Sequence, residues 1–358
     1  MKIFIIFLTN LFFLCNVYAE DISFTFDYMP SRFETRELTA GSRALGELCT
    51  SWAVMPDGTV CNSAFLNQNT KSFFLGRFYI GNGYSALSTA NAVLLKPITK
   101  DTLKKVFENN SVITMESQID LVFVTPYFSI EFAPYRIQYF SEIHNPNFPI
   151  IALHASLEKR VKLSGNLKLS RFTPALSQFT LGLELRLLDR KYIHNSFSFF
   201  KAIASPDAGL LPVNNQRAVF LDPSIGWASR KWPWKTRASI AARNIGKVWY
   251  SNSLYPEYTD IDIGVGVEPP VEIGQLGVGI EFVNLIYAQD FISRMRFGGS
   301  YKLGMMEIMS GVNANSLVTG LEFGVNIFQA GIVYEFIRND LRGLGPENKI
   351  STEFSFKL

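Results

Sequence analysis

Charged residues and long apolar runs are both scarce in this sequence. Only 18% of the 358 residues are Asp, Glu, Lys or Arg, against about 25% in a typical soluble domain. Beyond residue 20, no stretch approaches the roughly 20 continuous apolar residues that a membrane helix needs. These shortages argue against both an ordinary soluble domain and a helical membrane protein. The formal net charge of only +3 gives no reason to expect a nucleic-acid partner.

Histidine is equally rare, and its three positions, His144, His154 and His194, show no metal-ligand spacing. No nucleophile elbow accompanies them. We therefore expect neither a metal or other cofactor nor enzymatic activity, and we place His144 and His194 in loop or rim regions. A distant alternative is an outer-membrane hydrolase that uses His154 and a nearby serine on its outer wall.

The first residues, "MKIFIIFLTNLFFLCNVYAE", have the form of a secretory signal peptide. Lys2 precedes a short apolar core, and Ala19 is the small residue expected before the cut. Residues 1–19 are therefore predicted to be removed on export. Cys49 and Cys61 then remain, and in an oxidising compartment we expect them to form a disulfide, with two unpaired thiols as the alternative.

Residues 71–358 contain repeated segments of about ten residues in which apolar and polar side chains alternate, as in "TLGLELRLL" and the final "KISTEFSFKL". Segments of this length suit tilted strands that cross a bilayer. The predicted fold is all-β, a transmembrane antiparallel β-barrel of about 14 strands whose last strand pairs with the first, because lipid cannot satisfy an open sheet edge. A soluble sandwich tolerates the same alternation but needs more apolar residues for two buried sheet faces.

The polar sides of these strands are expected to face a lumen. Either their charges pair into a structural network, or they form a polar channel wall that biases which solutes pass. The predicted lumen-lining residues are Glu184, Arg186, Asp262, Glu268, Glu281, Arg296, Lys302, Glu322 and Glu335. Glycines on the same faces, such as Gly264 and Gly277, are expected to relieve crowding in the lumen or to bend a strand.

Three segments outside the alternating pattern are given other assignments. Residues 98–110 suit a short amphipathic helix that Thr102 can cap. Residues 189–216 and 339–348 are predicted to be longer loops on one rim of the barrel.

The segment "SRALGELCTSWAVMPDGTVCNSAFLN" resembles the opening of the FadL and PorV-like outer-membrane barrels. The matching positions are Arg43, Gly46, Ala53, Asp57, Asn62, Ser63 and Ala64. Ser63 stands where that family has proline, and Cys49 and Cys61 are additional. "TRASIAARNIG" likewise resembles a family strand that ends in Asn-x-Gly, here Asn244 and Gly246.

The resemblance implies that residues 20–70 form an N-terminal hatch folded into the lumen of a fourteen-stranded barrel in the outer membrane of a Gram-negative bacterium. FadL-like members pass hydrophobic small molecules through the lumen and sideways into the lipid bilayer. PorV-like members instead act as structural or secretion partners without transport. Phe354, Phe356 and Leu358 also resemble the C-terminal signal that the outer-membrane insertion machinery reads.

Overall fold

The structure is a computed structural model, and it describes residues 38–52, 58–68, 71–83, 112–144, 150–198, 213–229, 234–251, 255, 257–286, 294–314, 316–337 and 348–358. All of them belong to one compact unit, Glu37–Leu358. The predicted signal peptide, the helix predicted at residues 98–110 and the loop predicted at residues 339–347 lie outside the described residues. None of the described helices is long and apolar enough to span a membrane.

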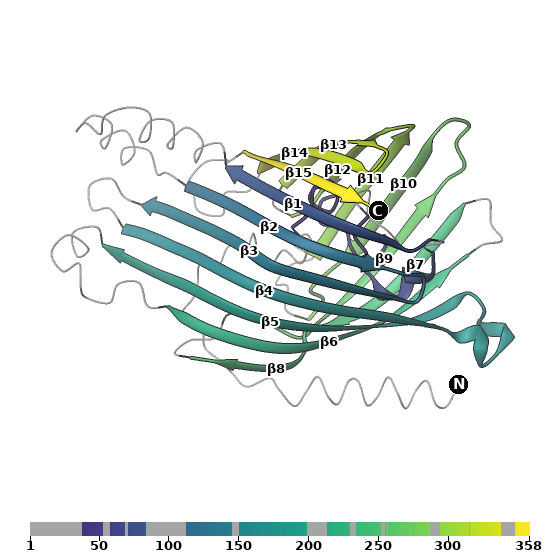
Figure 1. The fold of residues 1–358 in the computed structure, drawn as a ribbon, viewed down its shortest axis with the longest axis horizontal. Coiled ribbons are helices and arrows are strands. Elements are labelled where there is room, and N and C mark those ends of the chain that lie inside the picture. The colour runs from purple at the N-terminus through teal and green to yellow at the C-terminus, as the bar shows by residue number, and fades with distance from the viewer. Residues whose placement is uncertain are drawn as a thin grey trace. The chain divides into compact units, whose positions relative to one another are not determined.

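Fifteen strand segments form a single antiparallel sheet that closes on itself (Figure 1). Consecutive strands pair with one another except at β7, β8 and β9, and β1 pairs with β15 along nine residues from Leu75↔Lys357 to Gly83↔Lys349. The seal extends to Leu358, which exchanges backbone hydrogen bonds with Phe74 at 2.8 Å. The strands are β1 (Phe73–Gly83), β2 (Val112–Val124), β3 (Phe128–His144), β4 (Ile150–Lys168), β5 (Phe179–Ser198), β6 (Asn214–Ala228), β7 (Lys235–Arg243), β8 (Ile245–Tyr250), β9 (Asp260–Glu268), β10 (Gln275–Phe282), β11 (Met295–Leu303), β12 (Met306–Val312), β13 (Ser316–Val325), β14 (Phe328–Ile337) and β15 (Lys349–Lys357).

Two of these segments share one place in the wall. β7 and β8 both pair with the same edge of β6, β7 with Ser224–Ala228 and β8 with Gln216–Leu221. β7 and β8 are two parts of one strand that is interrupted at Asn244. Counted in this way, the closed barrel has fourteen strands, as the alternating pattern predicted. β9 pairs with β7, from Arg243↔Asp260 to Lys235↔Glu268.

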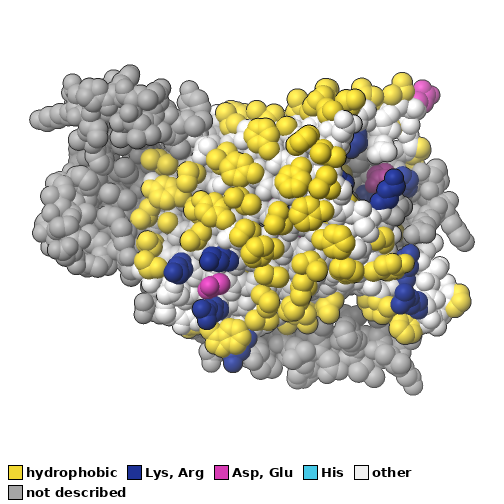
Figure 2. Space-filling model, in the orientation of Figure 1, with side chains coloured by type: hydrophobic (Ala, Val, Ile, Leu, Met, Phe, Trp, Pro, Cys, Tyr) yellow, Lys and Arg dark blue, Asp and Glu magenta, His cyan; other side chains and the backbone are white. Residues whose placement is uncertain are grey.

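The outer surface of the barrel is apolar. Leu181, Ile263, Phe297 and Phe354, on four well-separated strands, are 40%, 38%, 48% and 61% exposed. Figure 2 shows apolar side chains spread over the face formed by the front strands. A soluble sandwich would bury these residues together, and a broad exposed apolar wall is stable only in lipid. The alternation therefore marks a membrane-spanning wall.

The connections differ between the two ends of the barrel. At one end they are short, such as Thr125–Tyr127 between β2 and β3 and Asn326–Ile327 between β13 and β14. The β4–β5 connection at this end holds two 3₁₀ turns, η3 (Leu169–Arg171) and η4 (Pro174–Leu176). At the other end most connections are longer, although residues 313–315 alone join β12 and β13. In bacterial outer-membrane barrels the short turns face the periplasm and the long loops face outward.

The loop predicted at 189–216 is wrong for 13 of its 28 residues, at its two ends. β5 continues to Ser198 and β6 begins at Asn214, so only residues 199–213 connect them. The prediction failed because Asp189 and Lys191 put charges on the outward side of β5, which broke the apolar alternation. His194 is accordingly a strand residue near the rim, and His144 is the last residue of β3.

The hatch, which we define as residues 38–52 and 58–68, occupies the lumen. It contains the short helix α2 (Ala40–Ala44), where the Thr39 hydroxyl caps Ser42 N–H at 3.1 Å, and the 3₁₀ helix η2 (Ser63–Gln68). α2 lies against β12, β13, β14 and β15, while η2 lies against β3, β4, β5 and β6. These contacts lie on both sides of the barrel, so the hatch crosses the interior instead of lying on one wall.

Candidate functional site: the hatch and the wall break

A disulfide closes the central loop of the hatch. Cys49 and Cys61 are bonded, with their Cα atoms 5.0 Å apart and a sequence separation of 12. The loop is held to the wall by Glu281 on β10, whose Oε1 accepts the backbone N–H groups of Cys49 and Ser51 at 2.8 and 2.6 Å. Because Glu281 is completely buried, these charge-assisted bonds form an anchor out of contact with water.

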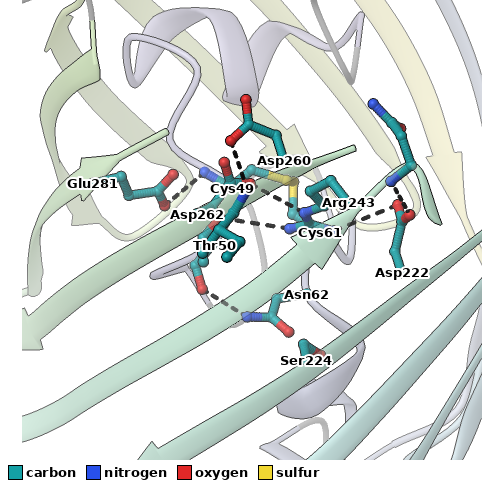
Figure 3. A network of polar contacts seen from close by, with 12 residues as sticks. Cys49, Thr50, Cys61, Asn62, Asp222, Ser224, Arg243, Asp260, Asp262 and Glu281 are labelled. Atoms are coloured by element: carbon teal, nitrogen blue, oxygen red, sulfur yellow. Dashed lines mark hydrogen bonds and ion pairs between the residues drawn. A yellow bond between two sulfur atoms is a disulfide. The ribbon is translucent and has the colours of Figure 1, made fainter. Parts of the chain in front are cut away.

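A second anchor holds the same loop to β7, two strands along the wall from β10 (Figure 3). The Thr50 carbonyl accepts hydrogen bonds from Asn62 Nδ2 at 2.8 Å and from Ser239 Oγ on β7 at 2.5 Å. The Thr50 hydroxyl lies 3.5 Å from Arg243 Nη2, also on β7. Arg243 Nε in turn donates to Asp262 on β9 at 3.1 Å. The disulfide loop is therefore bonded to β7 and β10, with β9 between them.

The break between β7 and β8 begins one residue beyond Arg243. Asn244 has φ of 56°, in the left-handed region that asparagine tolerates better than most residues. Its backbone N–H donates to Asp222 at 2.6 Å, its side-chain amide donates to the Tyr258 carbonyl at 2.9 Å, and its side-chain oxygen accepts from Arg186. The left-handed conformation of Asn244 ends the pairing of this strand with β9. The hydrogen bonds to Asp222, Tyr258 and Arg186 fix Asn244 in that conformation.

Above Asn244 the wall has a step. β8 pairs with β6, but β9 begins level with Arg243, so the described strands place no partner on the other edge of β8. Just before β9, Tyr258 and Thr259 contact Asn244, and the Thr259 hydroxyl donates to the Asn244 carbonyl at 3.0 Å. Arg243 therefore links Thr50 of the hatch loop to Asn244, the residue that separates β7 from β8.

The other parts of the hatch are fixed by equally specific contacts. Arg43 donates two hydrogen bonds to the carboxylate of Glu116 on β2, at 2.7 and 2.8 Å, and Ala40 N–H donates to Glu353 on β15 at 2.7 Å. At the far end, Ser63 and Ser224 share a hydrogen bond at 3.2 Å, and Asn67 donates to Thr180 at 2.9 Å.

Glycines on the inner wall allow the hatch to approach β9, β10 and β11 closely. A Cβ on Gly264 would lie 2.9 Å from atoms of Ser51, and one on Gly277 would lie 2.9 Å from the Trp52 ring. Real Cβ contacts are almost never so short, so these positions require glycine because of the hatch. This agrees with the expectation that glycine relieves crowding inside the lumen.

The predicted site residues fall in the interior, where most have a defined neighbour. Among the hatch motif, Arg43, Asn62 and Ser63 bond to the wall or within the hatch, Gly46 adopts φ of 69°, Ala64 N–H donates to Asn62, and Asp57 lies outside the described residues. Of the lumen-lining charges, Glu281 bonds the disulfide loop and Arg296 pairs with Glu47 of the hatch at 3.1 Å. The others contact wall residues or face the lumen: Glu184 with Ser164, Arg186 with Asp222, Asp262 with Arg243, Glu268 with Arg237, Lys302 with Glu307, and Glu335 opposite Lys349, with Glu322 buried on β13.

Sequence reasoning missed the residues that complete the site. Glu116, Asp222 and Arg243 occupy inward strand positions, as the predicted lumen-lining residues do, so alternation could have found them. Thr50 and Ser51 act mainly through backbone groups and carry no sequence signal.

His154 lies on the inner wall, which removes the arrangement considered for an outer-wall hydrolase. It is 1% exposed, faces His194 across the β4–β5 ladder, and its ring lies 5.5 Å from that of His194 and 5.7 Å from that of Tyr255. Within the described ranges, no group of three or more His, Cys, Asp or Glu side chains is placed to hold a metal ion.

Comparison with solved structures finds the same architecture in hydrocarbon channels. The deltaS2 mutant of the monoaromatic hydrocarbon channel TodX superposes with a TM-score of 0.51 at 11% identity, covering 89% of this chain and 97% of that one. A second TodX mutant gives 0.50 at 11% identity, covering 89% and 98%. The toluene transporter TbuX of Ralstonia pickettii gives 0.49 at 11% identity, covering 91% and 99%. No protein-family model matches the sequence, and no curated protein matches it.

The fold and the site define a membrane-spanning β-barrel whose lumen holds a hatch. Within that class, the chain has the FadL-like fold, which the opening segment of the sequence resembles.

Proposed function

We propose that this protein passes hydrophobic small molecules across the outer membrane and releases them sideways into the bilayer. The observation that carries the proposal is the direct link between the hatch and the interruption of the wall, through Thr50, Arg243 and Asn244. The fold shared with a monoaromatic hydrocarbon channel supports an uncharged, apolar substrate class.

The hatch argues against a simple water-filled pore. It is bonded to β2, β7, β10 and β15 and crosses the lumen, so a hydrated solute meets a folded obstacle held by buried ion pairs. An apolar solute has a different way out, because the step above Asn244 faces lipid. Leaving through the wall avoids a second passage through water, which is unfavourable for apolar surface.

The other predicted features take roles in this proposal. Residues 1–19 act as a signal peptide cut near Ala19, residues 20–70 form the hatch, and residues 71–358 form the barrel. The disulfide keeps the hatch loop compact, and the lumen-lining charges hold the hatch in place. The final strand, with Phe354, Phe356 and Leu358, guides insertion by the outer-membrane machinery.

The test is uptake of radiolabelled toluene by Gram-negative cells that lack their own hydrocarbon channels, with and without this protein. We expect uptake at low toluene concentration to rise several-fold, while uptake of a sugar of similar size stays unchanged. Sugar permeation without faster toluene uptake would instead indicate a polar pore and end the proposal.

The wall break is tested with Asn244→Val. A β-branched residue disfavours the left-handed conformation by about 1–2 kcal/mol, so β7 and β8 should straighten toward β9 and toluene uptake should fall several-fold. Asn326→Val is the matched control, since Asn326 also has positive φ, 53°, but lies in the short β13–β14 turn. Equal loss in both variants would mean that strain, and not the break, limits uptake.

A further inference from the structure

Among the described residues, the charged side chains on the outward face of the barrel lie in one place. Among outward positions of the described strands, the charged residues are Lys159 on β4, Asp189 and Lys191 on β5, Arg217 on β6 and Lys247 on β8, all exposed. Figure 2 shows dark blue side chains around one magenta side chain at the edge of the apolar field. We call these five residues the outer cationic patch, which has four cations and one carboxylate.

The patch is continuous across four neighbouring strands. Lys159 pairs with Asp189, Asp189 with Arg217, and Arg217 with Trp249, forming one cross-strand row. Lys191 lies one row above, opposite Asn215, and Lys247 lies one row below, opposite Val219. Directly opposite side chains in a sheet have Cβ atoms about 4.5–5.5 Å apart, so one anionic group can reach several of these cations.

Most of this positive charge is not neutralised by the protein. Arg217 Nε lies 3.4 Å from Asp189, and both side chains are largely exposed. The described part of the chain places no carboxylate within 4.0 Å of Lys159, Lys191 or Lys247. The Lys247 ammonium instead lies 5.4 Å from the centre of the exposed Trp249 ring.

The height of the patch on the wall matches the surface of a bilayer. From Phe179 to Leu187 the outward residues of β5 are apolar, and from Trp227 to Val219 those of β6 are apolar as well. Nine residues extend about 30 Å along a strand, which a tilt of about 40° reduces to about 25 Å, the usual height of the apolar band. Asp189 and Arg217 follow immediately beyond it, beside a tryptophan of the kind that marks the interface.

We propose that the outer cationic patch binds the phosphate groups of lipid headgroups in the leaflet at the long-connection end, which in this membrane is built largely from phosphorylated glycolipid. The charges would be unfavourable against acyl chains and face sideways, not toward a soluble partner above the rim. Phosphate supplies the complementary charge at the correct depth, and Arg217, oriented by Asp189, presents its guanidinium to it.

The experiment measures binding of bis-phosphorylated lipid A to the purified full-length protein in detergent micelles, by native mass spectrometry across a lipid titration. The dephosphorylated lipid is the matched ligand. We expect the phosphorylated form to bind much more tightly and its affinity to fall with added salt. Equal affinity for the two forms, or displacement by millimolar inorganic phosphate, would overturn the proposal in favour of apolar adsorption or a free-anion site.

The double variant Lys191→Gln/Lys247→Gln removes two cations that form no ion pair. A cation at an anionic membrane surface contributes about fivefold in affinity, so binding should weaken roughly 25-fold. Lys71→Gln/Lys235→Gln removes two exposed cations at the opposite rim and should leave affinity unchanged. If the first pair fails to fold, judged by heat-modifiable gel migration, Lys247→Gln alone should weaken binding about fivefold. Unaltered affinity in a folded patch variant, or an equal loss in the control, would refute the assignment.

Discussion

Glu281 on β10 accepts hydrogen bonds from both the backbone N–H and the hydroxyl of Ser51, at 2.6 and 2.8 Å. With the bond from Cys49 N–H, one carboxylate oxygen receives three hydrogen bonds from the hatch. The disulfide loop is therefore held to this wall by a single side chain.

Replacing that side chain is expected to loosen the hatch without opening the barrel. In Glu281→Ala, the buried N–H groups of Cys49 and Ser51 lose their acceptor, at about 1–3 kcal/mol each. Liposome swelling should show faster sugar permeation than in the wild type. Glu307→Ala is the control, because Glu307 is an inward carboxylate whose partner is Lys302 on the neighbouring strand. Similar permeation in both variants would contradict the anchoring role.

Loss of the disulfide should affect the hatch selectively. By the chain-entropy relation, a loop of this size contributes about 3 kcal/mol, so Cys49→Ser/Cys61→Ser should make residues 58–68 more mobile. Amide hydrogen exchange in detergent should become faster in this segment and stay unchanged in β4 and β5. Unaltered exchange in the hatch would show that its wall contacts are sufficient without the bond.

The buried pair of Arg77 on β1 and Asp120 on β2 offers a test of interior electrostatics. The two residues are directly opposite, and Arg77 Nε donates to Asp120 at 3.0 Å with both side chains fully buried. Arg77→Leu should cost about 3–5 kcal/mol because it strands a carboxylate, while Arg77→Leu/Asp120→Leu should recover much of that loss. Urea unfolding in lipid vesicles measures both, and additive losses would rule out strong coupling.

Tyr255 should titrate abnormally. It lies in the connection after β8, where burial raises the pKa of its phenol to about 12, although the Arg190 guanidinium 3.8 Å from the ring acts in the opposite direction. A raised pKa means that the folded protein holds the proton longer than the unfolded chain, so this contribution to stability is complete below about pH 10 and is lost between about pH 10 and 12. The absorbance difference at 295 nm between wild type and Tyr255→Phe should show a midpoint near pH 12, and a midpoint near 10 would contradict it.

Alternation alone predicted the closed wall, because lipid-facing residues recur at every second position along most of each strand. It failed where function or environment departs from that rule. Asp189 and Lys191 lie outside the apolar band, so the pattern predicts a loop from residue 189 onward, where β5 in fact continues to Ser198. Asn244 separates β7 from β8 through its left-handed backbone conformation. In the sequence it is only an asparagine in an Asn-x-Gly ending that resembles the family's.

The contents of the lumen were predicted as residues but not as contacts. Glu281 and Arg296 were recognised as inward charges, yet their partners in the hatch are more than 200 positions away in the chain. Local periodicity has no information over such distances, and the backbone groups that Cys49, Thr50 and Ser51 contribute do not depend on residue type.

The small inner face of β9, β10 and β11 implies something about the order of assembly. Gly264 and Gly277 leave room that Ser51 and Trp52 of the hatch fill, so a barrel completed around an empty lumen would have a hollow at these positions. We infer that the hatch and the barrel wall fold together, and that the hatch acts as a template for β9, β10 and β11.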